Sequence, residues 1–137
     1  TGIQLGRRFR ALKLWMVLRH FGAEGIRQRL AEHLRLAKLF AGWVDTSDTF
    51  ERLAPVPFSV VCFRACPATV SSDPAALDDL NERLLVAVNA TGDVFLSHTK
   101  LDGQFVLRLA IGHIRTTERH VARAWELLQT QLADLSQ

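Results

Sequence analysis

The stretch VFLSHTKLDGQFVLRLAI, residues 94–111, decides the fold of this 137-residue chain. Both halves are rich in the β-branched and large apolar residues that are typical of strands. Between them lies Asp102-Gly103, a strong signal for a two-residue hairpin turn. The stretch therefore predicts an antiparallel hairpin of two strands, residues 94–101 and 104–111.

A second pair of strands precedes this hairpin, at residues 50–54 and 58–65, where valine and phenylalanine recur on either side of two prolines. Helical periodicity accounts for most of the remaining chain. It predicts helices that follow Asp73-Pro74 and Thr117, and two more before the first strand, at residues 8–21 and 23–44, divided by Gly22. This order predicts an α+β fold, in which helices pack against an antiparallel sheet.

The first two helices carry more apolar surface than one neighbour could cover. Residues 8–21 are apolar almost all round, which is typical of a helix that is buried on most sides. The second helix places one apolar stripe on a single face, and Leu36 and Leu39 lie outside that stripe. The stripe consists of Ile26, Leu30, Leu34, Ala37, Ala41 and Val44. Two apolar faces predict two neighbours, and a chain of this length does not obviously provide both.

Composition and charge suit a single globular domain, with 48% apolar residues and a net charge of +3. The charge is uneven, because residues 1–40 carry +7 and the rest carry −4. A basic first third is compatible with binding nucleic acid or a membrane surface, but we interpret it as a solvated helix face or an interface with an acidic body. No stretch is long and apolar enough to span a bilayer.

Cys62 and Cys66 are too far apart on a strand to form a disulfide, and free thiols fit a reducing compartment.

The sequence lacks the motifs of the common hydrolytic and metal-dependent active sites. Its five histidines are scattered, and the C-x3-C spacing of the cysteines has no second Cys/His pair to complete a zinc site. Lys100 precedes the hairpin turn, where a desolvating pocket for a reactive amine is not expected. No catalytic residue and no metal site are predicted within these residues.

Arg108 is the most informative polar residue, because it interrupts an apolar strand and shares a face with Val106 and Ala110. Burial of an isolated guanidinium is costly, so it needs an acidic partner or a cleft that admits one. One interpretation is a structural ion pair. The other is recognition of a carboxylate by the planar guanidinium, which can donate two parallel hydrogen bonds.

Several motifs in order along the chain resemble those of the group II pyridoxal-phosphate-dependent amino-acid decarboxylases. The resemblance is to the branch that decarboxylates aromatic L-amino acids, tyrosine, tryptophan and histidine. The motifs are LGRRFRALKLW (5–15), FGAEG (21–25), VCFR (61–64), HT (98–99), FVLRLAI (105–111) and HVARAW (120–125). They cover nearly the whole chain, whereas residues 66–75 are longer than the usual connection in the family.

The resemblance implies that the chain is the C-terminal part of such an enzyme. Residues 49–137 would form the small α+β domain of the fold-type-I architecture, and residues 1–48 the two helices that lead into it from the absent large domain. The cofactor would be pyridoxal 5'-phosphate, but its lysine and other binding and catalytic groups precede this region in the family. The parent would be a cytoplasmic homodimer, and these residues alone are expected to be inactive.

Two residues carry a substrate-binding role by this resemblance. Gly6 matches a position near the substrate ring, and Arg108 is similar to a small-domain arginine that points at the substrate carboxylate. The implied reaction converts an aromatic L-amino acid to its amine and CO2, although some relatives form an aldehyde instead. The alternative is a free-standing basic α+β module for binding or oligomerisation, with a protein partner or, less expected, a nucleic acid.

Overall fold

A computed structural model describes residues 10–70 and 73–136. The chain divides into two compact units, residues 1–32 and 33–137, which are treated separately below. Residues 33–48 thus belong to the same unit as the sheet. The expected boundary at residues 48 and 49 concerns the longer protein and stays a prediction.

The first helical segment, α1 (Arg10–Asp45), is broken at Gly22, whose φ of 64° and ψ of 175° are not helical. A positive φ is accessible to glycine at little cost, because glycine has no Cβ. The predicted division into two helices at this residue is therefore confirmed. The predicted start at residue 8 lies outside the described residues.

In the 10–32 unit, the helix before Gly22 exposes its apolar side chains. Leu14, Trp15 and Met16 are 61%, 57% and 54% exposed. The described residues thus leave this helix uncovered, and the neighbours expected for it stay a prediction. A helix that is apolar all round needs more covering surface than the described residues provide.

We expect the 137-residue chain to self-associate through this helix, because contiguous apolar patches of more than a few hundred Å² seldom remain exposed to water. Sedimentation velocity at increasing concentration should show species larger than the 15.4 kDa monomer. Substitution of Leu14 and Trp15 by glutamate should shift the distribution toward monomer. A wild-type profile that stays monomeric at high concentration would refute the expectation.

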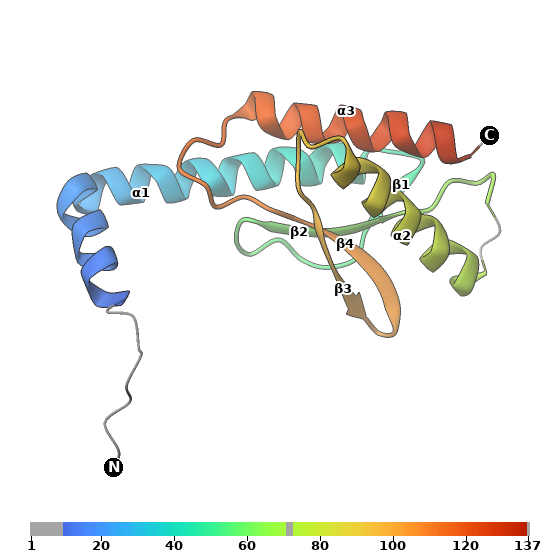
Figure 1. Ribbon diagram of the computed structural model, residues 1–137, viewed down its shortest axis with the longest axis horizontal. Coiled ribbons are helices and arrows are strands. Elements are labelled where there is room, and N and C mark those ends of the chain that lie inside the picture. Colours follow the sequence, from blue (N-terminus) through green and yellow to red (C-terminus); the bar gives the residue numbers. More distant parts are fainter. Residues whose placement is uncertain (1–9, 71–72, 137) are drawn as a thin grey trace, which may run out of the picture. The chain divides into compact units, whose positions relative to one another are not determined.

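The 33–137 unit contains one antiparallel sheet with strand order β1-β2-β4-β3. The strands are β1 (Phe50–Arg52), β2 (Val60–Ala65), β3 (Ser97–Leu101) and β4 (Gln104–Ala110). Helices α2 (Pro74–Ala90) and α3 (Glu118–Leu135) and the part of α1 from His33 onward lie on one face of the sheet (Figure 1). The predicted α+β class with an antiparallel sheet is confirmed.

Local signals in the sequence set the ends of these elements. Asp102 and Gly103 both have positive φ, 50° and 83°, as a two-residue hairpin turn of type I′ requires. Asp73 caps α2, because its Oδ2 accepts a hydrogen bond from the Ala76 N–H at 3.2 Å, and Pro74 follows in the first turn.

The core lies between the helices and the sheet around Phe40, whose ring centroid is 5.1 Å from that of Phe63 and 5.6 Å from that of Trp125. On α1, the buried face differs from the predicted stripe: Leu36 is fully buried, whereas Leu30 is 57% exposed. The buried side chains are Leu36, Ala37, Phe40, Ala41 and Val44. Helical periodicity places residues on a common face, but only the position of the sheet decides which face is covered and where along the helix burial begins.

Two side chains of α2 replace strand pairing where β2 and β4 separate. The β2–β4 register ends at Phe63 opposite Leu107. Beyond it, the Ala65 N–H donates to Asn81 Oδ1 at 2.7 Å, and Asn81 Nδ2 donates to the Ala65 carbonyl at 2.9 Å. On β4, the Phe105 N–H donates to Asp78 Oδ1 at 2.8 Å. These contacts satisfy backbone groups that would otherwise be buried without partners.

Candidate functional site on the open face of the sheet

The sheet has one face covered by helices and one that we call the open face. On β2 the side chains of Val61, Phe63 and Ala65 are fully buried, and the intervening Cys62 and Arg64 are half-buried. Because successive side chains of a strand point to opposite faces, Cys62 and Arg64 lie on the open face. The strand register adds neighbours on β3 and β4: Ser97, Thr99, Val106 and Arg108.

Arg108 occupies the middle of the open face, directly opposite Cys62 on β2 and Ser97 on β3. Its side chain is half-buried, and among the described residues it forms no hydrogen bond or ion pair. The structural ion pair that the sequence left open is therefore not present in the part of the chain that the structure describes. The guanidinium remains available to a ligand or to another part of a longer protein.

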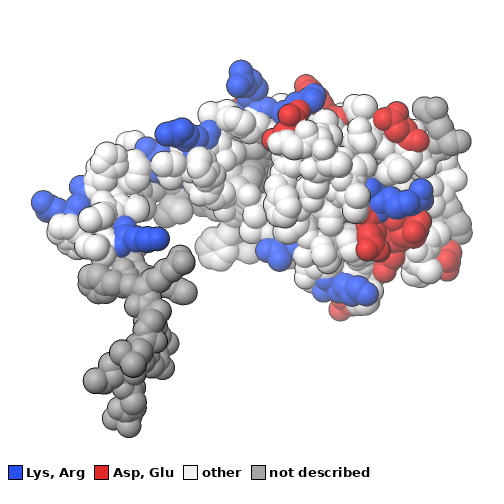
Figure 2. Space-filling model, viewed as in Figure 1, with Lys and Arg blue, Asp and Glu red and all other residues white. Residues whose placement is uncertain are grey.

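Arg64, on the same open face, forms the kind of structural ion pair that Arg108 lacks among the described residues. It is the other half-buried arginine of the 33–137 unit, and its Nε donates to the Glu51 carboxylate on β1, its neighbour in the register. Other arginines of this unit also pair with carboxylates, namely Arg35, Arg52, Arg83 and Arg123. Acidic and basic side chains accordingly lie interspersed on the face of this unit seen in Figure 2. Such pairing does not favour a phosphate-binding surface.

The two cysteines are free thiols, as predicted, and both are half-buried rather than fully buried. Burial raises the pKa of the Cys66 thiol, and the negative charge of Glu51 raises it further, while Arg64 acts in the opposite direction. Cys66 is thus held in the unreactive thiol form. Among the described residues no group of three His, Cys, Asp or Glu side chains could hold a metal ion.

The described residues do not provide a lysine suited to bind pyridoxal phosphate. The lysines of the chain, Lys13, Lys38 and Lys100, are all exposed, so none is held in the desolvated pocket that a reactive amine needs. A cavity of about 400 Å³ beside the end of α3 has Asp48 as its one ionisable side chain. A lysine that binds the cofactor would have to come from outside the described residues.

The remaining residues singled out in the sequence are not brought together with Arg108. Gly6 lies outside the described residues. His98 stacks on Phe105 with ring centroids 4.7 Å apart, and His120 takes part in the N-terminal cap of α3 with Thr117. His33 is hydrogen-bonded to the His113 carbonyl at 3.2 Å. These histidines have structural roles, as their scattered positions indicated.

The sequence predicts some of the neighbours of Arg108 but not all of them. A two-residue turn at 102–103 fixes the hairpin register, and this register places Ser97 opposite Arg108. Cys62 lies opposite Arg108 through a pairing between strands that are distant in sequence, which no local signal specifies.

No described helix is long and apolar enough to cross a membrane.

Comparison with known proteins gives relatives that include amino-acid decarboxylases and a phenylacetaldehyde synthase. Residues 1–66 match the family model of the pyridoxal-dependent decarboxylase conserved domain. The chain is 48% identical to Tyrosine decarboxylase 2 of Arabidopsis thaliana, over 93% of its own length and 23% of that protein. It is 45% identical to Phenylacetaldehyde synthase of the same plant, over 97% of its length and 27% of that protein.

A solved structure extends the similarity to three dimensions. The crystal structure of the Oryza sativa enzyme TDC with PLP and tryptamine matches with a TM-score of 0.88 and 36% identity. The match covers 98% of this chain and 29% of that one. The chain thus spans about a quarter of the length of the relatives it matches. In its motifs, its fold and these similarities, the chain resembles a segment of the pyridoxal-dependent decarboxylases.

Proposed function

We propose that the chain is part of a pyridoxal-phosphate-dependent decarboxylase that converts an aromatic L-amino acid to its amine and CO2. The names of the relatives support this substrate class, since they include a tyrosine decarboxylase and a structure solved with tryptamine. The single observation in this chain that supports it is the half-buried Arg108, which has no acidic partner among the described residues. A carboxylate is the group that such a guanidinium is suited to bind.

In this proposal Arg108 binds and orients the substrate. Two parallel N–H···O hydrogen bonds would hold the carboxylate plane at a fixed angle, which a lysine ammonium cannot do. Cys62 and Ser97, which lie opposite Arg108 on the neighbouring strands, have short side chains and so leave the guanidinium accessible. Orientation of the carboxylate matters because the bond to be broken joins it to the α-carbon, and a fixed geometry lowers the entropic part of the barrier.

The parent protein would supply what this segment lacks, including the large domain and the cofactor-binding residues. The proposal includes a fold-type-I homodimer in which residues 49–137 form the small domain. It also includes a cytoplasmic location, for which the two free cysteines are the supporting observation.

A second candidate reaction is formation of an aldehyde from the same amino acids, because one relative is named phenylacetaldehyde synthase. The full-length parent should be incubated with pyridoxal phosphate and L-tyrosine, L-tryptophan, L-phenylalanine or L-glutamate, with CO2, amine and aldehyde all measured. We expect CO2 and amine in equal amounts from at least one aromatic substrate. Aldehyde in place of amine would select the second candidate, and turnover of glutamate alone would contradict both.

Gly6 is proposed to lie beside the substrate ring. In the full-length parent, Gly6→Ser should shift the ratio of kcat/KM values away from bulky indole substrates toward smaller or more polar rings. A single added group in a fitted pocket changes discrimination by about 1–3 kcal/mol. The measurement is kcat/KM for L-tryptophan and L-tyrosine on the same preparations, with Gly2→Ser as the control. An unchanged ratio would remove Gly6 from the ring-binding site.

A further inference from the structure

The cavity of about 400 Å³ beside the end of α3 has no part in the proposed function. Three segments that are distant in sequence form its walls: residues 48–49 between α1 and β1, residues 67–69 after β2, and residues 129–136 at the end of α3. We call it the Asp48 cavity. Its volume is within the range of sites that bind small molecules.

Hydrogen bonds of the backbone hold the walls of the Asp48 cavity in place. The Cys66 N–H donates to the Thr49 carbonyl at 2.8 Å, which joins two of the three segments. The Val70 N–H donates to the Pro67 carbonyl at 3.1 Å and closes a turn there. Beside Asp48, the Thr49 N–H donates to Ser47 Oγ at 3.2 Å. A ligand would therefore enter a preformed site and would lose little affinity to the ordering of loops.

The larger part of the lining is apolar. Pro67 and Leu132 are buried, whereas Ala68 and Ala133 are exposed. Apolar groups thus extend from the core of the unit to the opening of the cavity. They suit the hydrocarbon or aromatic part of a ligand, because its burial removes apolar surface from water.

Three polar side chains of the lining have no hydrogen-bonding partner among the described residues. They are the carboxylate of Asp48, the hydroxyl of Thr69 and the amide of Gln129. Each of the three contains an oxygen that accepts hydrogen bonds. A primary ammonium group has three N–H donors and no acceptor, so it is the polar group that matches this set.

The electrostatics of the cavity also favour a cation. Asp48 is the one ionisable side chain in its lining, so among the described residues no lysine or arginine neutralises it there. The α3 helix ends at Leu135, within the wall, and α1 ends at Asp45, three residues before Asp48. The C-terminal end of a helix carries a partial negative charge. These charges attract an ammonium group and disfavour a carboxylate or a phosphate.

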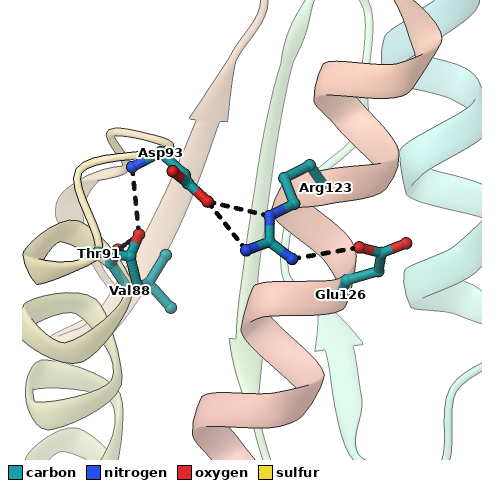
Figure 3. Close-up of polar contacts among 5 residues, drawn as sticks. All are labelled: Val88, Thr91, Asp93, Arg123 and Glu126. Carbon is teal, nitrogen blue, oxygen red and sulfur yellow. Dashed lines mark hydrogen bonds and ion pairs between the residues drawn. The ribbon is translucent and has the colours of Figure 1, made fainter.

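A second cavity, of about 360 Å³ near the start of α3, differs in that both of its carboxylates are paired (Figure 3). Arg123 Nε and Nη2 donate to Asp93 Oδ2, at 3.0 and 2.9 Å. Arg123 Nη1 contacts Glu126 Oε2 at 3.4 Å. A cationic ligand there would have to replace existing ion pairs, whereas at Asp48 it would replace only water.

We propose that the Asp48 cavity binds an arylalkylamine, that is, a primary amine with a small aromatic body. The ammonium group pairs with the Asp48 carboxylate, and the ring packs against Pro67 and Leu132. The inference goes beyond the proposed function and does not depend on it, because these three residues lie apart from Arg108 and the open face. It is therefore tested by binding and not by activity.

The test is photolabelling of the full-length parent with 4-azidophenethylamine, an arylalkylamine that reacts covalently with neighbouring residues in light. Mass spectrometry after digestion with trypsin assigns the label to individual peptides, so labelling elsewhere in the parent is counted separately. We expect label in the tryptic peptides that begin at Ala65 and Ala124, which contain residues 67–69 and 129–136. An excess of 2-phenylethylamine should abolish it.

Asp48→Asn should raise the probe concentration for half-maximal labelling of these peptides by about 10-fold, because it removes a charged hydrogen-bond acceptor. The matched control is Asp134→Asn, which removes the same charge from an exposed position of α3 that does not line the cavity. We expect this control to change the concentration by less than about twofold. Both positions are exposed, and a thermal midpoint close to that of the unsubstituted parent establishes that each variant is folded.

A second probe, 3-(4-azidophenyl)propanoate, has the same ring and a carboxylate in place of the amine. It should label the two peptides about 10-fold less than the amine does. Equal labelling by the two probes would overturn the proposal, because the cavity would then bind rings without recognising a cation. Equal effects of Asp48→Asn and Asp134→Asn would also overturn it, since they would indicate general attraction to an acidic surface. Absence of label from both peptides would do the same.

Discussion

Asn81→Leu is expected to lower the free energy of unfolding of the 33–137 unit by about 3 kcal/mol. Asn81 is fully buried and forms three hydrogen bonds, two with the backbone of Ala65 and one with the Leu77 carbonyl. Leucine has a similar volume but cannot replace these bonds, so the Ala65 N–H and carbonyl would lose their partners in the interior. Each buried group left without a partner costs about 1–3 kcal/mol.

Urea unfolding followed by tryptophan fluorescence measures this effect, because Trp125 is partly buried and packs against the core beside Phe40. The control is Glu82→Leu at the adjacent, exposed position of α2, where we expect a change within about 0.5 kcal/mol. If the two variants unfold at the same urea concentration, the hydrogen bonds of Asn81 do not support the junction between β2 and β4.

Arg108→Lys in the full-length parent is expected to lower kcat/KM by about 100-fold, while the thermal midpoint changes little. Lysine keeps the positive charge and loses the planar pair of donors. Because the Arg108 side chain has no hydrogen-bonding partner among the described residues, its replacement should cost little folding stability. Arg108→Leu should affect folding more, because it also alters the polarity of the open face.

The control is Arg115→Lys, at an exposed position of the loop before α3, which we expect to be neutral in both assays. Thermal midpoint and steady-state kinetics are to be measured on the same preparations. A lowered midpoint with full activity per folded molecule would assign Arg108 a structural role and would contradict the proposed one.

Local patterns in the sequence predicted the elements of the 33–137 unit well. The Asp102-Gly103 turn, the Asp73 cap and the break at Gly22 each depend on the conformational preference of one or two residues, so they could be read without tertiary information. Predicted strands were longer than the observed ones, 94–101 against Ser97–Leu101, because the Asn89 side chain, and not a strand, pairs with Leu96.

Long-range pairing accounts for what the sequence did not reveal. Periodicity on α1 could not show that burial begins near His33, and so Leu30 and Leu34 were wrongly assigned to the buried face. In the same way, Arg108 could be recognised as unusual on its apolar strand. Only the strand registers show that Arg64 pairs with Glu51 between β2 and β1, and that Arg108 lies opposite Cys62, which is not acidic, between β4 and β2. The exposure of Phe58 and Phe95 was not predicted, because exposure of an aromatic side chain has no local signature.

The central claim is that Arg108 binds the carboxylate of an aromatic substrate. It is tested most directly with two competitive inhibitors of the full-length parent, tryptamine and indole-3-propanoate, which share a ring but carry only an amine or only a carboxylate. In Arg108→Gln the inhibition constant of the propanoate should rise about 100-fold, as expected for loss of charged hydrogen bonds, and that of tryptamine should stay the same. Equal changes for both inhibitors, or none for the propanoate, would contradict the account.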